Sequence, residues 1–157
     1  MRRALRTLMT LAVAGALGVA GAGAAQASAY GASPISPFSY QDDSGATKSI
    51  PYGCALIHSV IGEGINITAQ TASVDCAGLA AMRSGLFCDV KIVFTFTSAQ
   101  GRTKTLDTQR LSGCRTLGIK LSNEELPADV DPGKTCVRLF VNGETSPRAS
   151  SCHIISA

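Results

Sequence analysis

The residues whose spacing says most about chemistry are the cysteines, and at least eleven residues separate consecutive ones. The close Cys-x-x-Cys pair of a thiol-redox site or a zinc site is therefore absent. An even number of well-spaced cysteines in an exported chain indicates three disulfides instead. We predict structural bridges, with no metal site and no cofactor, from Cys54, Cys76, Cys88, Cys114, Cys136 and Cys152.

Two histidines, His58 and His153, are the candidates for acid–base chemistry. Each lies in an apolar run with β-branched neighbours, which favours a packed position in a strand. A Ser-His-Asp site stays open at this stage, because such triads assemble in space rather than in sequence. No nucleophile-elbow pattern accompanies either histidine, so we predict a non-enzymatic protein without catalytic residues.

An acidic cluster lies near the C-terminal third of the chain and comprises Glu124, Glu125, Asp129 and Asp131. Such a cluster could bind calcium or a basic partner. It lacks the alternating oxygen ligands and the central glycine of an EF-hand loop, so we interpret it as a solvated loop. With no Trp and three Tyr, the chain also has few flat side chains on which a sugar could stack.

Residues 1–29 have the composition of a signal peptide. Three arginines precede an apolar run without charges, and Ala25–Ala27 and Ala27–Ala29 both fit the small-x-small cleavage rule. We therefore expect a secreted, extracellular protein of bacterial type whose mature chain begins near Ser28 or Tyr30. A single membrane anchor is the alternative, but a span needs about twenty strongly apolar residues and this run is short and rich in Ala and Gly.

Loss of this segment would change the charge balance. The whole chain has 14 Lys and Arg against 11 Asp and Glu, and Arg2, Arg3 and Arg6 would leave with the signal peptide. The mature chain would then be neutral overall and would hold no Lys/Arg-rich run. Nucleic acids and anionic membrane surfaces are therefore poor candidates for partners.

The clearest structural unit is the stretch from Cys88 to Cys114. Residues 88–97 alternate apolar and mostly polar side chains, which predicts a half-buried strand. Phe94 and Phe96 would point inward, and Thr95 and Thr97 would face solvent or be only partly covered. Residues 98–102 supply a turn, and a second Thr-rich strand returns. The two cysteines are then opposite each other at the open end of a hairpin.

Two further hairpins are expected. Residues 50–61 and 65–70 are β-prone runs on either side of Gly62–Gly64, and residues 136–141 and 151–155 flank an Asn-Gly turn. Pairing in sequence order follows, as Cys54–Cys76, Cys88–Cys114 and Cys136–Cys152. Ser73–Gly85 is the one helix candidate, with Ser73 as its cap and Gly85 as its end.

Together these elements predict a mainly β fold: an antiparallel sheet or sandwich of hairpins with one short helix and three disulfides. Residues 50–157 would form a single disulfide-stapled domain. Residues 30–49 are rich in Ser, Gly, Ala and Pro without periodicity, so we expect a flexible N-terminal arm. A role for this arm as a propeptide or in surface attachment stays open.

A set of short motifs lies between residues 54 and 114: Cys54-Ala55, Cys76-Ala77-Gly78-Leu79-Ala80-Ala81, Cys88, Gln100-Gly101-Arg102 and Ser112-Gly113-Cys114. Over this part of the chain, the set resembles the bacterial subtilisin-inhibitor family. The resemblance implies a secreted sheet-plus-helix domain with one bridge at the start of the helix and one that begins at the reactive loop. The family's His-Pro loop is missing, its reactive bond would fall at Val90–Lys91 inside a predicted strand, and Cys136 and Cys152 have no counterpart.

These features favour a secreted protein that binds through surface loops, most concretely a proteinaceous inhibitor of an extracellular hydrolase. The expected partner is an extracellular protein such as a secreted hydrolase, with no nucleic acid and no membrane once the signal is removed. A structural or cell-surface-associated protein is the first alternative. A small secreted hydrolase is the second.

Overall fold

The computed structural model describes residues 28–156 as an all-β protein with antiparallel strands. The predicted signal peptide lies almost entirely outside these residues. The strands are β1 (Ala29–Pro34), β2 (Phe38–Gln41), β3 (Thr47–Ile50), β4 (Cys54–Glu63), β5 (Asn66–Cys76), β6 (Phe87–Ser98), β7 (Thr103–Arg115), β8 (Ile119–Ser122), β9 (Ala128–Asp129), β10 (Gly133–Phe140) and β11 (Ala149–Ile155).

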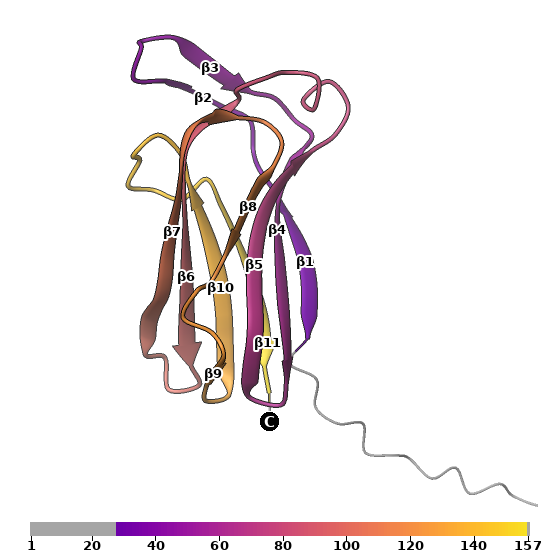
Figure 1. Cartoon of the computed structure of the whole chain (residues 1–157), viewed down its shortest axis with the longest axis vertical. Helices are drawn as coiled ribbons and strands as arrows, with labels where there is room; N and C mark the ends of the chain where they lie inside the picture. Colours follow the sequence, from indigo (N-terminus) through magenta and orange to yellow (C-terminus); the bar gives the residue numbers. More distant parts are fainter. Residues whose placement is uncertain (1–27, 157) are drawn as a thin grey trace, which may run out of the picture.

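Two sheets pack face to face as a sandwich (Figure 1). The first, here the β4 sheet, has the order β1-β4-β5-β8, with β9 also paired to β5. The second, the β6 sheet, has the order β11-β10-β6-β7, and β2 and β3 form a separate hairpin. The predicted mainly β fold with antiparallel sheets and three disulfides is confirmed.

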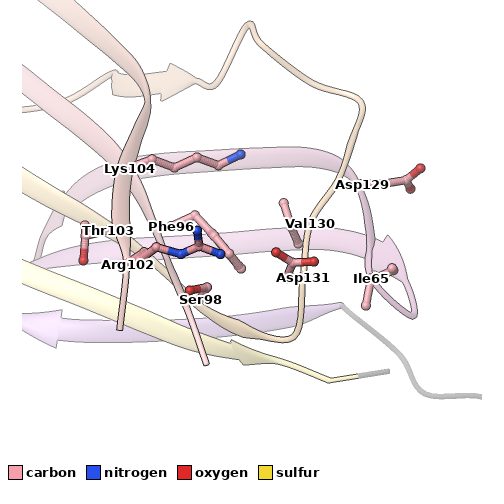
Figure 2. Close-up of a pocket in the computed structure, with 9 residues that line it drawn as sticks. All are labelled: Ile65, Phe96, Ser98, Arg102, Thr103, Lys104, Asp129, Val130 and Asp131. Atoms are coloured by element: carbon pink, nitrogen blue, oxygen red, sulfur yellow. The ribbon is translucent and has the colours of Figure 1, made fainter. Parts of the chain in front are cut away.

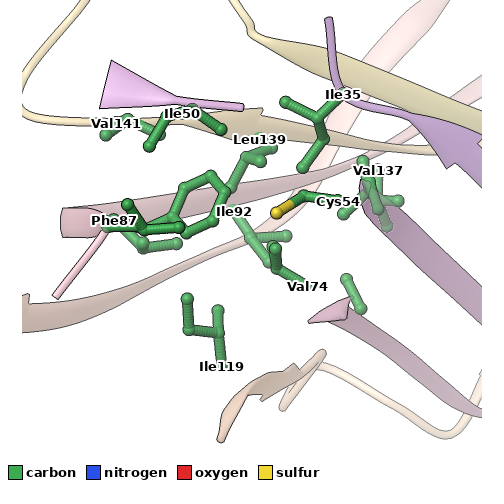
Figure 3. Close-up of a cluster of buried hydrophobic side chains, with 14 of the residues drawn as sticks. Ile35, Ile50, Cys54, Val74, Phe87, Ile92, Ile119, Val137, Leu139 and Val141 are labelled. Atoms are coloured by element: carbon green, nitrogen blue, oxygen red, sulfur yellow. The ribbon is translucent and has the colours of Figure 1, made fainter. Parts of the chain in front are cut away.

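The inner faces of both sheets supply one apolar core (Figure 3). Alternation along each strand directs every second side chain inward, which is why the core residues recur with a period of two. The buried side chains are Leu56, Ala72, Val74 and Ile119 from the β4 sheet, and Val90, Ile92, Phe94, Val137 and Leu139 from the β6 sheet. A smaller cluster of Val60, Ile67, Phe96, Val130 and Ile155 lies nearer the β4–β5 turn.

The predicted disulfide pairing is confirmed for all three bridges. Each bridge joins residues that are direct register partners of neighbouring strands: β4 with β5, β6 with β7, and β10 with β11. The three predicted hairpins are present with these strands. Each bridge therefore lies within one hairpin rather than tying one hairpin to another. The first two bridges are at or next to the open ends of their hairpins, and Cys136–Cys152 lies midway along the pairing of β10 with β11.

The predicted helix at Ser73–Gly85 is wrong, and residues 28–156 contain no helix. Its first residues belong to β5, where Ser73 pairs with Ile57 on one side and Lys120 on the other. The remainder is a loop, in which Gly78 has a φ of +59°. A stretch this short has little helical stability of its own, so pairing to two neighbouring strands outweighs it.

Since residues 28–156 form no helix, they include no helical segment that could span a membrane.

Residues 30–49 were expected to be a flexible arm, and the structure instead places most of them in the three strands β1, β2 and β3. Strand β1 pairs with β4 over its whole length, and β2 and β3 form a hairpin. Ile35 and Ile50 are both buried in the main core. The Ser- and Pro-rich composition of residues 30–49 does not predict these strands. A strand such as β1 can form without a strong local pattern, because it is stabilised by pairing with a distant segment, β4.

The predicted solvent-facing position of Thr95 is also wrong. The side chains of Phe94, Thr95 and Phe96 are all buried. The pairing of β6 with β7 shifts at a bulge between Phe94 and Thr95, and on the other side Thr95 is paired with Cys136. Since paired residues share a face of the sheet, the Cys136–Cys152 bridge lies on the outer face beside Thr95.

Candidate functional site

The feature that stands out on the surface is the loop Ala77–Leu86, which joins β5 to β6 at one end of the sandwich (Figure 1). It begins directly after the Cys54–Cys76 bridge and ends two residues before Cys88 of the next bridge. Leu79 is 79% exposed and Met82 is 82% exposed. Large apolar side chains this exposed are typical of interaction sites when they gather in one place.

The loop Ala77–Leu86 is fixed to the body of the protein from within. The methyl group of Ala80 is buried in the main core, and Leu86 is buried as well. The Ala77 N–H donates to the carbonyl of Gly53 at 2.8 Å, and the Leu86 N–H donates to Thr116 Oγ1 at 3.0 Å. Leu79 and Met82 are thus held out by a loop that is anchored at Ala77, Ala80 and Leu86.

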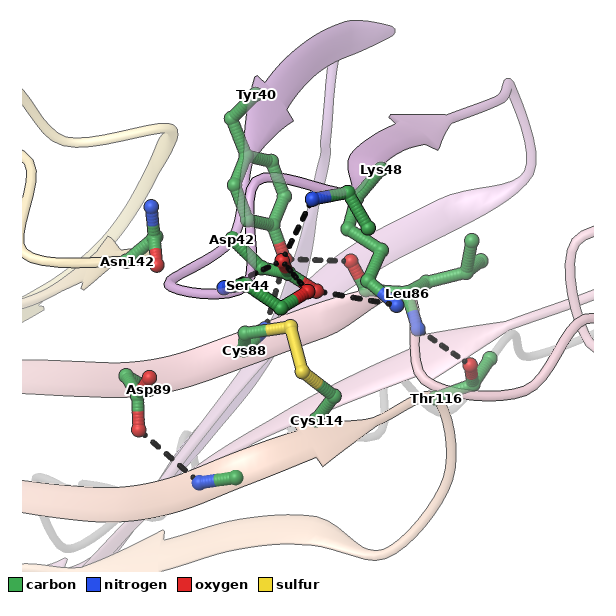
Figure 4. Close-up of a disulfide and its surroundings, with 12 residues drawn as sticks. Tyr40, Asp42, Ser44, Lys48, Leu86, Cys88, Asp89, Cys114, Thr116 and Asn142 are labelled. Atoms are coloured by element: carbon green, nitrogen blue, oxygen red, sulfur yellow. Dashed lines mark hydrogen bonds and ion pairs between the residues drawn. A yellow bond between two sulfur atoms is a disulfide. The ribbon is translucent and has the colours of Figure 1, made fainter.

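Tyr40 locks the far end of the loop (Figure 4). Its hydroxyl donates to the carbonyl of Leu86 at 2.8 Å and accepts the N–H of Cys88 at 2.8 Å. Burial raises the pKa of Tyr40, and the hydrogen bond from Cys88 offsets part of this rise. The hydroxyl therefore keeps its proton and its donor role at neutral pH.

Two more exposed apolar side chains lie on loops at the same end of the sandwich. Tyr52 precedes β4 and is highly exposed, and Leu117 lies between β7 and β8. Met82 and Leu117 line a common shallow pocket of about 320 Å³. We call Tyr52, Leu79, Met82 and Leu117 the loop-end apolar set.

The Val90–Lys91 bond, where the family resemblance would place a reactive bond, lies inside β6. Val90 is buried, and β6 is paired with β7 on one side and with β10 on the other. The Lys91 ammonium lies 4.2 Å from the centre of the Phe140 ring. A protease could reach this bond only after both neighbouring strands had moved, whereas the loop Ala77–Leu86 is open.

The two histidines are brought together by the fold. The rings of His58 and His153 lie 4.6 Å apart between centroids, and His153 Nε2 donates to the His58 carbonyl at 3.1 Å. A Cβ atom on Gly31 would meet His153 Cε1 at 2.8 Å, so the glycine makes room for this ring. His58 is fully buried and His153 is partly buried, in line with the predicted packed positions.

His58 belongs to a buried polar layer that lies between the two apolar clusters. Gln70 Nε2 lies 2.9 Å from His58 Nε2 and donates to Thr135 Oγ1 at 2.9 Å. Asn123 Nδ2 donates to Gln70 Oε1 at 3.0 Å, which orients the Gln70 amide with its NH2 group toward His58. The Nε2 of His58 is therefore an acceptor, and its ring is neutral.

Burial lowers the pKa of His58 to about 3, and the nearby His153 contributes to this shift. The Nδ1 of His58 has no well-formed hydrogen bond within residues 28–156, and the backbone of Ser151 offsets only part of the lowered pKa. Within the same residues, no carboxylate is a hydrogen-bond partner of either histidine. The arrangement is that of a structural polar layer.

The acidic cluster is divided by the fold. The Glu124 N–H donates to Asp107 Oδ2 at 2.8 Å and the Glu125 N–H donates to Asn123 Oδ1 at 3.1 Å, so both glutamates lie on a structured turn. Asp129 and Asp131 instead line a cavity of about 410 Å³ at the end of the sandwich that lies opposite the loop Ala77–Leu86 (Figure 2). This cavity could not be predicted from local sequence patterns, because its other walls come from segments far apart in the chain.

The cysteine sulfurs offer no free thiolate. Asp42 lies close to the sulfurs of Cys88 and Cys114, but these two sulfurs are bonded to each other (Figure 4). The carboxylate of Asp42 instead accepts hydrogen bonds from Ser44 and Ala46 and pairs with Lys48 at 3.5 Å. The two sulfurs therefore form a disulfide that lies beside the turn capped by the Asp42 carboxylate.

Comparisons with known protein families, with curated proteins and with solved structures found no match to this chain.

Proposed function

We propose that this is a secreted, non-enzymatic binding protein, most concretely an inhibitor of an extracellular hydrolase, and that the loop Ala77–Leu86 is its binding element. One observation carries the proposal: Leu79 and Met82 project from a loop that two disulfides and a buried alanine hold in place. The predicted signal peptide and the six cysteines of the sequence support an extracellular setting.

A protruding, anchored loop suits a concave partner. A loop that is already ordered in the free protein loses less conformational entropy when it binds. Exposed apolar side chains that enter pockets of a partner commonly supply most of the binding energy. The active-site cleft of a secreted hydrolase is a concave surface of this kind, and we expect the loop Ala77–Leu86 to bind there.

Replacing Leu79 and Met82 together by serine is expected to weaken inhibition by about thirtyfold or more, the size of a lost pair of binding hot spots. The measurement is stoichiometric titration of hydrolase activities secreted by the protein's own source. Because both side chains are exposed, the melting temperature should stay unchanged.

The matched control is a double substitution of Tyr30 and Ile154 by serine. Both side chains are 72% exposed, and they lie on β1 and β11 rather than on the loop Ala77–Leu86. Inhibition should persist in this variant. Equal inhibition by the loop variant and the wild type would reject the loop as the binding element, and concentration-dependent self-association without any inhibition would favour a structural role.

The exported protein is expected to begin near Ser28 or Tyr30, because the small-x-small sites follow the apolar run directly. Intact mass spectrometry of protein from the culture medium measures this. A mass that retains residues 2–25 would contradict the proposed processing and weaken the case for secretion.

A further inference from the structure

A second surface feature lies at the end of the sandwich that is remote from the loop Ala77–Leu86. It is the cavity of about 410 Å³ between the β6–β7 turn and the segment that leads from β9 to β10 (Figure 2). Pockets that bind small organic ligands have volumes of roughly 300–1,000 Å³. The space is therefore sufficient for a small molecule.

The inner wall of this cavity is apolar. Phe96 and Val130 are both buried and belong to the smaller core cluster, so they present a fixed surface. Ile65, at the β4–β5 turn, is partly exposed on the same cavity. An apolar body of a ligand could pack here and leave its polar groups at the edges.

The charged side chains of the cavity are arranged by sign. Arg102 and Lys104 come from the β6–β7 side, and Asp129 and Asp131 come from the β9–β10 side (Figure 2). None of the four takes part in an ion pair within residues 28–156. Asp129 is positioned by a hydrogen bond of 2.7 Å from Asn66 Nδ2 to its Oδ1.

Ser98 adds a polar group that the fold leaves unsatisfied. The residue is 8% exposed and lines the cavity, and its hydroxyl has no hydrogen-bond partner within residues 28–156. Its backbone is held in the β6–β7 turn, where the N–H donates to Arg102 and the carbonyl accepts from Gly101. A buried hydroxyl without a partner is unfavourable, and this one is a polar group next to the cavity wall.

We propose that this cavity binds a short apolar peptide with both termini free. The peptide carboxylate would pair with Arg102 and Lys104, and its ammonium group with Asp129 and Asp131. Its side chains would pack on Phe96 and Val130. A lone anion or cation would meet charges of its own sign, whereas a molecule that carries both charges at its ends satisfies both walls.

The proposal is independent of the proposed hydrolase inhibition, because the cavity and the loop Ala77–Leu86 lie at opposite ends of the sandwich (Figure 1). Its test therefore does not depend on finding the hydrolase. A negative result for dipeptide binding would not contradict the proposed hydrolase inhibition, and a negative result for inhibition would not contradict dipeptide binding.

The test is calorimetric titration of the full mature protein with leucyl-leucine, compared with the same dipeptide blocked by acetylation and amidation. The free dipeptide is expected to bind, and blocking both termini should weaken binding by at least about tenfold, as loss of charge-assisted hydrogen bonds does. Equal binding of the two compounds, or no binding of the free dipeptide up to about ten millimolar, would overturn the proposal.

Charge-removing variants assign the site. Arg102→Gln and Asp131→Asn should each weaken binding of the free dipeptide by about tenfold, and neither should alter the melting temperature because both side chains are exposed. Arg110→Gln is the matched control, since Arg110 lies on the same strand as Lys104 but lines a different pocket. Unchanged binding in the first two variants, or an equal loss in Arg110→Gln, would place the ligand elsewhere.

Discussion

Replacing Phe94 with alanine is expected to lower the free energy of unfolding by about 3–5 kcal/mol, the usual cost of truncating a buried phenylalanine. The ring is fully buried in the main core between the two sheets. The chain has five Phe and no Trp, so one ring is a large share of the aromatic core. Urea denaturation with all three disulfides intact measures the loss.

The control for Phe94 is Thr97→Ala on the outer face of the same strand. Thr97 is only partly buried, and its hydroxyl bonds to the hydroxyl of Thr103 at 2.9 Å. The expected cost is about 1 kcal/mol or less. Thr95 is not a suitable control, because it is buried beside Cys136. Equal costs at Phe94 and Thr97 would contradict the sandwich, since they would mean that both faces of β6 are covered.

Acidification is expected to destabilise the protein through His58. The pKa of this ring is 6.5 in an unfolded chain and about 3 in the folded state. The unfolded state therefore takes up a proton that the folded state does not, and stability falls as the pH falls below about 6.5 toward 3. The linkage relation gives a loss of about 2 kcal/mol between pH 7.5 and 5 and about 4 kcal/mol by pH 3.

The first physical cause is the burial of the ring, which removes water from the charged form. The His153 ring, 4.6 Å away between centroids, contributes to the same lowering of the pKa. In addition, Gln70 directs its NH2 group at His58 Nε2, so a protonated ring would place an N–H against another donor.

The measurement is the free energy of unfolding by urea at several pH values from 7.5 to 5, a range above the ordinary pKa of carboxylates. A His58→Gln variant keeps a polar side chain but cannot be protonated. It should be less stable than the wild type at pH 7.5 and should have a much smaller pH slope. The same slope in both proteins would mean that a group other than His58 is responsible.

Local patterns in the sequence determined the hairpins and the bridges. Alternation along β6 and the turn at residues 98–102 made Cys88 and Cys114 face each other, and the Asn-Gly turn did the same for Cys136 and Cys152. Such signals are readable because turn residues and a period of two act over a few neighbouring residues. Antiparallel pairing then leaves little freedom in the choice of partners.

Only the tertiary structure decided the features that depend on distant neighbours. Ser73 was expected to cap a helix, but it lies in a strand between β4 and β8. Ile35, from a stretch without periodicity, also packs into the core. Likewise, the polar layer joins His58, Gln70 and Thr135 from three strands, and the exposure of Leu79 follows from the burial of Ala80 beside it. In each case the packing of residues far apart in the chain outweighed the local propensity, because burial and strand pairing contribute more free energy than a short segment can supply by itself.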